Sequence, residues 1–350
     1  MVGTWRVNIT LVRKRLSDIP NLEGYGVFVD GLDFAHLARD EWMELGKLHM
    51  NKLVMVIRNT GLKRDHFYKV MRAWGRDRQN YAAALFARYP WASNRHELMA
   101  SDEVTDHEKA ILKEYDKIGG NTKGAVLRVT GDGTGLFDHG ELLWHSNESG
   151  DIAFTPGVAL LGDHGMTKSA TGFMVTTPYY YSLSDSIRSE LDEMVLVHNF
   201  QDGKINVEGE NNLLYKNMCP EPDTEIPLVI QSPAGIKGLH FPYNTVTGSN
   251  NDKLLAEVKR GLEKYTYDYW WENDDDLLIF DNSIVQHRRL GDTSDRLCHR
   301  YQFDYTYLQY KLTKKPYMPY LQEPYISRYN RKMDIVSNQF KVFGSPPSCL

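Results

Sequence analysis

Three cysteines in 350 residues are too few and too scattered to organise this chain. Cys219, Cys298 and Cys349 form no C-x-x-C pair that could hold zinc or carry out disulfide exchange. An odd number of dispersed cysteines also offers no disulfide framework. We therefore expect the protein to work in a reducing cytoplasm.

Long apolar runs are absent as well. No stretch approaches the roughly 20 apolar residues that a membrane-spanning helix needs. The first residues, with Arg6 among polar neighbours, lack the apolar core of a signal peptide. No internal repeat or low-complexity tract is present. The sequence thus predicts a soluble, intracellular protein with no membrane partner.

A strong excess of one charge sign is also missing, because the formal net charge is only −5. No overall field would attract nucleic acid or an anionic membrane. The short basic clusters at 13–15 and 288–289 are typical of solvated surface and are too short for a binding patch. A small-molecule substrate is the expected partner, and homo-oligomerisation stays open.

Apolar residues make up 41% of the chain and aromatic residues 12%, enough for a large core. Helical spacing is clearest at 34–48, 65–74 and 254–265, and a more polar helix is expected at 102–118. Ser184 offers an N-cap for a helix over 187–196. Apolar runs predict buried strands at 53–58, 125–129 and 277–280.

Two of the expected strands lead into histidines. The half-apolar run 140–143 precedes His145, and the apolar run 277–280 precedes the segment 281–287, which ends at His287. A closed β-barrel brings such distant strand ends together at its mouth. Asp281 and Asn282 are expected to form a tight turn that aligns the second strand.

Two arginines follow at a spacing that suits the same site. Arg296 and Arg300 lie on an apolar strand, where an inward guanidinium would need a partner. The planar fork of arginine binds a carboxylate through two hydrogen bonds. Two imidazoles on one face, with open positions beside them, are typical of non-haem iron(II).

Through these segments taken together, the chain resembles the taurine dioxygenase family of Fe(II)/2-oxoglutarate-dependent oxygenases. That family carries W-H-x-D, a threonine opening T-x-[FW], then W-D-N-x-x-x-x-H and R-x-x-x-R. The likeness extends to the N-terminal region 24–75 and covers about residues 24 to 305. The matching positions are Trp144, His145, Thr171, Asp281, Asn282, His287, Arg296 and Arg300.

The resemblance implies a mainly β fold with flanking helices (α+β), built on a double-stranded β-helix of the jelly-roll, cupin-like type. It implies one oxygenase domain over 1–350. Residues 1–120 would form an N-terminal α/β cap region, 121–310 the jelly-roll core with insertions, and 311–350 a tail packing on the barrel.

The resemblance also implies the chemistry. Fe(II) would be held by His145, Asn147 and His287, and 2-oxoglutarate would be decarboxylated to succinate while an unactivated C–H bond is hydroxylated. Arg300, helped by the Thr171 hydroxyl, would bind the C5 carboxylate of 2-oxoglutarate. Arg296 would lie near its C1 carboxylate.

One position departs from the family pattern, because Asn147 stands where the family has aspartate. Asn147 could be a neutral third ligand, which leaves the site more positive by one charge. Strand alternation would turn Glu148 to the opposite face, although a bulge could bring it in. Alternatively the position is effectively vacated, as in related halogenases, or the chain is a non-catalytic ligand-binding jelly roll.

Overall fold

A computed structural model gives the structure of the chain. It describes residues 15–77, 89, 91–92, 95–106, 108–110, 112–113, 126–131, 140–150, 152, 154–199, 207 and 224–342. The helix expected at 102–118 lies partly outside these residues.

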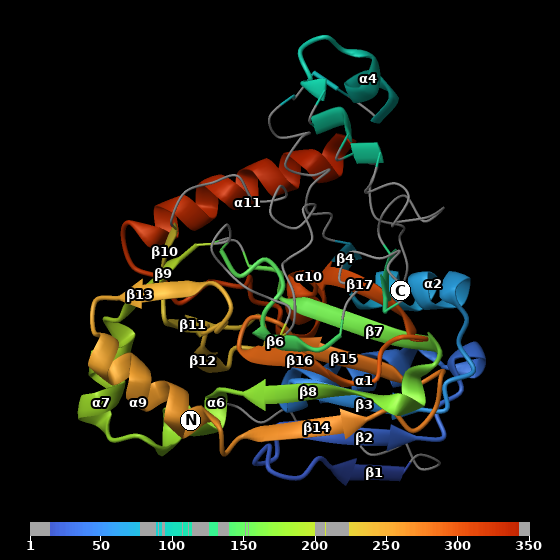
Figure 1. Cartoon of the computed structure of the whole chain (residues 1–350), viewed down its shortest axis with the longest axis horizontal. Helices are drawn as coiled ribbons and strands as arrows, with labels where there is room; N and C mark the ends of the chain where they lie inside the picture. Colours follow the sequence, from blue (N-terminus) through green and yellow to red (C-terminus); the bar gives the residue numbers. More distant parts are fainter. Residues whose placement is uncertain are drawn as a thin grey trace.

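The largest element is an eight-stranded sheet (Figure 1). Its strands run in the order β1-β2-β3-β15-β7-β17-β4, and β5 also pairs with β17. Neighbouring strands are antiparallel except β2 and β3, which are parallel. The strands are β1 (Arg15–Asp18), β2 (Gly26–Asp30), β3 (Val54–Arg58), β4 (Arg76–Asp77), β5 (Val126–Thr130), β7 (Gly157–His164), β15 (Leu277–Asp281) and β17 (Leu297–Asp304).

The central strands of this sheet are buried on both faces. In β15, Leu278 and Phe280 join one hydrophobic cluster, whereas Leu277 and Ile279 join another on the opposite side. Side chains alternate between the two faces of a strand. A continuous apolar run is therefore what a doubly covered strand requires, and the predicted strand at 277–280 is confirmed.

A four-stranded sheet covers one face of the large sheet. Its order is β14-β8-β16-β6. Phe173 and Val285 from this sheet share one buried cluster with Val158 and Phe280 from the large sheet, so the two sheets pack face to face. The strands are β6 (Leu142–His145), β8 (Ser169–Val175), β14 (Thr266–Trp270) and β16 (Val285–Gly291).

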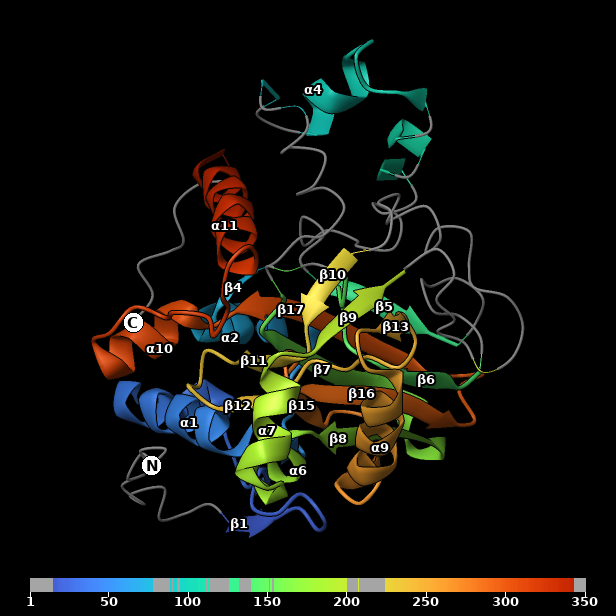
Figure 2. The same cartoon turned by 90° about the vertical axis from the view of Figure 1, so that its left-hand side faces the viewer.

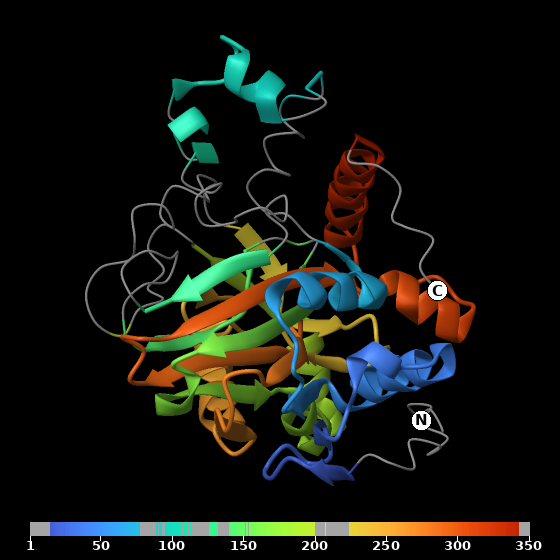
Figure 3. The same ribbon diagram turned by 90° about the vertical axis from the view of Figure 1, so that its right-hand side faces the viewer.

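Helices cover the other face of the large sheet (Figure 3). They bury Leu45, Phe67, Trp74 and Leu308 in the second cluster. The helices predicted near 34–48 and 65–74 are confirmed, the first as a short 3-10 turn followed by an α-helix. The elements are η1 (Phe34–His36), α1 (Arg39–Lys52), α2 (Arg64–Trp74) and α10 (Thr306–Thr313).

A third layer lies across one end of the two sheets, at the left in Figure 1 and toward the viewer in Figure 2. Its apolar side chains pack with Met174 of β8. Ser184 accepts a hydrogen bond from Ile187 N, as predicted, although that helix ends at Asp192. The layer contains α6 (Thr177–Ser182), α7 (Asp185–Asp192), α9 (Asp252–Leu262), β9 (Val195–His198), β10 (Thr224–Pro227), β11 (Val229–Gln231), β12 (Lys237–Leu239) and β13 (Val246–Ser249).

Three further elements complete the described chain. They are α4 (Arg95–Ala100), η2 (Met166–Lys168) and α11 (Tyr325–Val342). Before α11, the Tyr317 hydroxyl donates to Gln231 O at 2.5 Å and the Tyr320 hydroxyl to Asp192 at 3.0 Å. Helix α11 then runs above the sheets (Figures 1 and 2). The protein is thus mainly β with flanking helices, as expected.

None of the helices described has the length and apolar content needed to cross a bilayer.

Candidate functional site

The structure brings His145 and His287 together on the inner face of the four-stranded sheet. His145 ends β6 and is the cross-strand partner of His287 in β16. Their ring centroids lie 4.1 Å apart, with the planes tilted by 46°. Antiparallel pairing places directly opposed side chains on one face. One metal ion could therefore contact both imidazoles.

Both rings are held in their neutral form. The Nδ1–H of His145 donates to Leu143 O at 2.7 Å, which leaves Nε2 with a lone pair. Burial lowers the pKa of His145 to about 4, assisted by the charges of Arg300 and Arg289. Burial, the neighbouring His145 and the charge of Arg300 lower the pKa of His287 well below its ordinary value. Neutral imidazole is the form that binds metals.

Asn147 lies in a turn directly after β6 and is 7% exposed. The side chain of Asn282 fixes the backbone of this residue, because it accepts from Asn147 N and donates to Asn147 O, both at 2.9 Å. Asn147 Nδ2 has no hydrogen-bond partner among the described residues. In that part of the chain, no set of three His, Cys, Asp or Glu side chains is placed to hold a metal.

Glu148 does not follow the alternation that the sequence predicted. Residues 147–150 form a turn, and Glu148 has a left-handed backbone with φ of +58°. Its carboxylate accepts from Gln302 Nε2 at 2.7 Å and from the Thr155 hydroxyl. The expectation of an outward Glu148 was therefore wrong, because strand geometry ends at His145. Its carboxylate nevertheless joins no metal-binding group with the histidines.

Two aromatic rings pack beside the histidines. Phe280 lies 4.8 Å from His287 and 5.3 Å from Phe173, measured between ring centroids. Both phenylalanines are fully buried in the cluster between the two sheets. They make the surroundings of His287 apolar, which accounts for the burial effect on its pKa.

Thr171 and Arg296 share one aromatic neighbour. Trp271 Nε1 donates to the Thr171 hydroxyl at 3.1 Å, and the guanidinium carbon of Arg296 lies 5.7 Å from the Trp271 ring centroid. Arg296 is buried, yet its Nε and Nη1 find no hydrogen-bond partner among the described residues. Burial lowers the pKa of Arg296, so a bound anion would stabilise the charged guanidinium.

Arg300 is also buried and belongs to the inner face of β17. Cys298, two residues earlier, lies in the cluster between the sheets, and alternation gives Arg300 the same side. Its charge lowers the pKa of both His145 and His287. Of Arg296 and Arg300, Arg300 is therefore the one whose positive charge acts on both imidazoles.

Arg289 was missed by the sequence reasoning, which placed the basic pair 288–289 on the solvated surface. Arg289 is only 3% exposed, and its Nε donates to Gly140 O at 2.8 Å. It is the cross-strand partner of Thr171 and lies two residues after His287, on the same face. That two-residue spacing was the available signal. Arg288 lies on the outer face, paired with Asp268 at 2.8 Å.

Asp281 and Asn282 form the turn that the sequence predicted. Asp281 Oδ1 accepts from the backbone N–H groups of Ser283 and Ile284, at 2.8 and 3.2 Å. Its other oxygen accepts from the Tyr305 hydroxyl. Burial raises the pKa of Asp281, and these hydrogen bonds oppose the rise. The turn fixes where β16 begins and hence where His287 lies.

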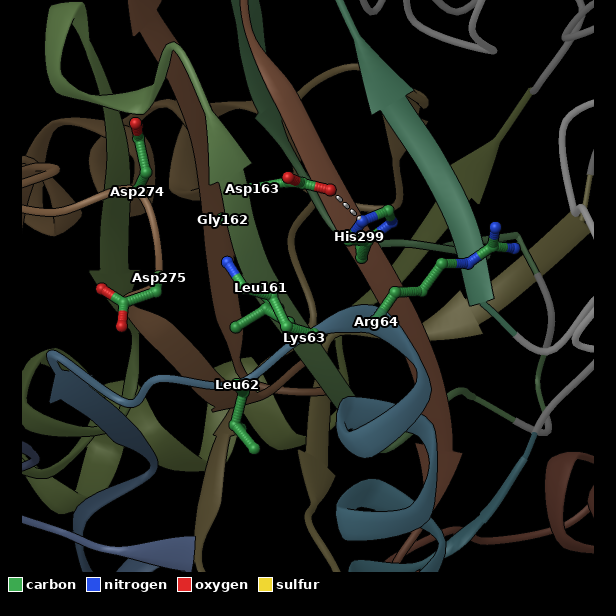
Figure 4. Close-up of a pocket in the computed structure, with 9 residues that line it drawn as sticks. All are labelled: Leu62, Lys63, Arg64, Leu161, Gly162, Asp163, Asp274, Asp275 and His299. Carbon is green, nitrogen blue, oxygen red and sulfur yellow. Dashed lines mark hydrogen bonds and ion pairs between the residues drawn. The ribbon is translucent and has the colours of Figure 1, made fainter.

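A separate pocket of about 330 Å³ opens on the helix-covered side of the large sheet (Figure 4). His299 lines it and contacts Asp163 at 2.7 Å. Alternation along β17 turns His299 away from the side that Arg300 faces. The sheet therefore separates this pocket from the histidine pair, and we do not assign the candidate site to it.

Comparison with known proteins supports the same view of the fold. No curated protein sequence matches the chain. A taurine dioxygenase structure from Burkholderia xenovorans superposes with a TM-score of 0.57 and 15% identity, covering 83% of this chain and 89% of that one. A structure of AAD-2 in complex with Mn(II) and N-oxalylglycine gives a TM-score of 0.56 and 16% identity, covering 83% and 96%.

At these identities the two structures show a shared fold. The stronger finding is a family model, described as taurine catabolism dioxygenase TauD, TfdA family, which matches residues 19–302. This span includes every candidate site residue named above. The chain therefore belongs to the TauD/TfdA family of dioxygenases and is an oxidoreductase.

Proposed function

We propose that this chain is an Fe(II)/2-oxoglutarate-dependent dioxygenase that hydroxylates an unactivated C–H bond of a small molecule. The observation that carries the proposal is the facing pair of neutral imidazoles, His145 and His287. The buried Arg289 and Arg300 lie on the inner faces of the same two sheets. Two packed sheets with the histidines at strand ends also support a jelly-roll core. A cytoplasmic location fits the scattered cysteines.

Three side chains would hold the metal. His145 Nε2 and the unpartnered Nδ1 of His287 are neutral donors, and the Asn147 amide oxygen is a third. The donor types fit iron(II), although an amide in place of a carboxylate leaves the site one negative charge short. Iron(II), when bound, supplies oxygen activation and the oxidising power for C–H cleavage.

Arg296 and Thr171 are best placed for the distal carboxylate of 2-oxoglutarate. They are linked through Trp271, and two buried donors of Arg296 lack a partner among the described residues. A bidentate carboxylate would satisfy those donors. The resemblance had suggested Arg300 for this role. The geometry favours an exchange, with Arg300 nearer the imidazoles and hence nearer the C1 carboxylate.

The protein residues then bind, orient and exclude water. The Leu143 carbonyl fixes the tautomer of His145, so that Nε2 faces the metal. Phe173 and Phe280 keep the surroundings of His287 dry. Dry, positively charged surroundings strengthen the attraction between the arginines and the carboxylates of 2-oxoglutarate.

Succinate release from 2-oxoglutarate, measured with and without added Fe(II), tests the proposal. We expect metal-dependent succinate formation that falls at least about a hundredfold in H145A and H287A, since each removes a metal donor. H36A is the matched control, because His36 is an exposed histidine on η1. No iron-dependent succinate in the wild type, with or without candidate substrates, would contradict the proposal.

Asn147 motivates a second candidate, a non-catalytic ligand-binding protein. No third acidic ligand joins the histidines in the described part of the chain. Calorimetry separates the two functions. A dioxygenase should bind 2-oxoglutarate more tightly once Fe(II) is present, whereas a binding protein should show the same affinity without metal. Chloride-dependent affinity would instead indicate a halogenase.

A further inference from the structure

His240 connects the two turns that carry the candidate metal site. It directly follows β12, and its ring lies between two backbone carbonyl oxygens. Nε2 is 3.0 Å from Ser149 O, and Nδ1 is 2.9 Å from Ser283 O. Ser149 belongs to the turn that holds Asn147, and Ser283 to the turn that leads into β16 and His287.

The ring is fixed on its remaining sides. His240 is 2% exposed, and its backbone N–H donates to Leu228 O at 2.7 Å. Phe154 packs against the imidazole at 4.7 Å between centroids, nearly edge to face. A ring held this firmly sets the distance between the two carbonyl oxygens that it contacts.

Each of the two ring nitrogens of His240 thus faces a hydrogen-bond acceptor. A neutral imidazole has a single N–H and can donate to one carbonyl oxygen only, whereas an imidazolium donates to both. A carbonyl oxygen 3 Å from a bare ring nitrogen is repelled by it. Burial lowers the pKa of His240, so the ring is neutral: its protonated nitrogen draws one turn toward it, and its bare nitrogen limits how closely the other turn approaches.

We propose that His240 is a positioning residue for the metal site, because it fixes the separation between the turn carrying Asn147 and the turn preceding His287. His240 does not contact the metal in this scheme. It acts together with Asn282, whose side chain ties Asn147 to the second turn from the other side. The inference rests on the proposed function, since it assigns the metal to His145, Asn147 and His287.

A neighbouring histidine supplies the control. His198 is equally buried, and its ring centroid lies 5.7 Å from that of His240. Its Nδ1 contacts the Thr245 hydroxyl at 3.1 Å, and Thr245 in turn contacts the Ser149 hydroxyl at 3.0 Å. His198 thus reaches the Asn147 turn through Thr245, and its Nε2 has no hydrogen-bond partner among the described residues. Replacing His198 removes a buried histidine but keeps the contacts of His240 with Ser149 and Ser283.

The experiment measures the affinity of the full chain for Co(II), which reports on coordination through its visible spectrum. We expect H240F to bind Co(II) about 10- to 100-fold more weakly, the range found when a residue supporting metal ligands is removed. H240Q keeps a side-chain donor and should recover part of this loss. H198F should stay within about twofold of the wild type, even if both phenylalanine variants melt at a lower temperature.

Unchanged Co(II) affinity and spectrum in folded H240F would overturn the inference. So would an equal loss in H240F and H198F, since that would indicate general loosening. If H240F does not fold, ¹⁵N-histidine NMR of the wild type decides. A slowly exchanging ring N–H that is absent from H240Q supports the bridge, and a rapidly exchanging one refutes it. Failure of the wild type to bind Co(II) would instead refute the proposed function.

Discussion

Asn147 places a neutral amide beside two neutral imidazoles, so the three proposed ligands carry no charge. Asn147→Asp adds one negative charge next to a divalent cation. Unit charges 4 Å apart interact by about 4 kcal/mol at an effective dielectric constant near 20. Desolvation of the carboxylate offsets part of this gain. We expect N147D to bind Fe(II) or Co(II) about tenfold more tightly or better, as measured by metal titration.

Asn147→Ala is the matched control, because it removes the amide oxygen without adding charge. It should bind the metal more weakly than the wild type if the amide is a ligand. Equal affinity of N147A and the wild type would show that the position contributes nothing to binding. Tighter binding by N147A in the presence of chloride would favour an exogenous anion in that position.

The two arginines can be distinguished by their effects on 2-oxoglutarate. Hydrogen bonds to charged groups contribute about 1.5–3 kcal/mol each, so removing a bidentate partner should be costly. We expect R296A to raise the KM for 2-oxoglutarate about 100-fold or more, and R300A to raise it less. R296K should rescue little, because lysine lacks the planar fork. Steady-state kinetics with succinate detection provide the measurement.

A larger effect of R300A on this KM would restore the assignment that the resemblance first implied. The Trp271→Phe variant adds an independent check. It removes the donor to Thr171 while keeping an aromatic ring beside Arg296. A KM change in W271F smaller than that in R296A would show that the guanidinium dominates the binding.

Sequence reasoning identified residues of the site unevenly. His145, His287, Thr171, Arg296 and Arg300 were predicted from the motifs that resemble those of the family. Glu148 and Arg289 could not be placed in the same way. The direction of Glu148 depends on a positive φ that no local pattern signals for glutamate. Arg289 resembles a surface charge in composition, and its two-residue spacing from His287 indicates an inward side chain only once β16 is known to be a strand.

At the scale of elements, an ion pair that passes over Gly172 links three strands of the smaller sheet on their outer face. Asp268 of β14 and Arg288 of β16 are the cross-strand neighbours of Gly172 in β8. Their side chains form an ion pair over the glycine, with Arg288 Nη2 donating to Asp268 Oδ2 at 2.8 Å. A Cβ on residue 172 would lie 2.7 Å from Arg288 Cγ.

We therefore expect Gly172→Ala to lower the free energy of unfolding by about 1–3 kcal/mol, the usual range for overpacking. Urea unfolding measures this change. In a D268A/R288A background the same substitution should be neutral or stabilising, because the obstructing side chains are gone and glycine weakens a strand interior. An equal cost in both backgrounds would place the strain in the backbone instead.

The long elements were easier to predict from sequence than the short ones. The strands at 53–58 and 277–280 and the helix at 65–74 have apolar patterns set by burial on defined faces, and the structure contains all three. Strands β11 and β12, with three residues each, are too short for a periodic pattern. Tertiary packing around His240 and Phe241, not local preference, decides their conformation.

At the scale of the whole molecule, six buried histidines among the described residues share one electrostatic property. Burial lowers the pKa of each, to about 3 for His49 and about 4 for His145. In the unfolded chain these rings should titrate near pH 6.5. The pKa is also lowered for His198, His240, His287 and His299.

The sign of the effect on stability follows from proton uptake. Below about pH 6.5 the unfolded rings bind protons while the folded rings stay neutral, so stability is full above this pH and falls as the pH decreases. Each histidine contributes up to about 1.4 kcal/mol per pH unit. Six together give a limiting slope of about 8 kcal/mol per pH unit, measurable by urea unfolding of metal-free protein between pH 7 and 5.

His49 isolates one share of this slope because it belongs to α1 and packs on the helix-covered face of the large sheet, across that sheet from the histidine pair. Its Nδ1 accepts from Trp74 Nε1 at 3.2 Å, and its ring packs 5.2 Å from Tyr305. His49→Leu loses that hydrogen bond at every pH, which lowers stability by a constant amount. Leucine takes up no proton, so the slope should also fall by about 1.4 kcal/mol per pH unit. Parallel curves for H49L and the wild type would mean that the folded His49 is protonated near its ordinary pKa, in conflict with a ring enclosed by Trp74, Phe303 and Tyr305.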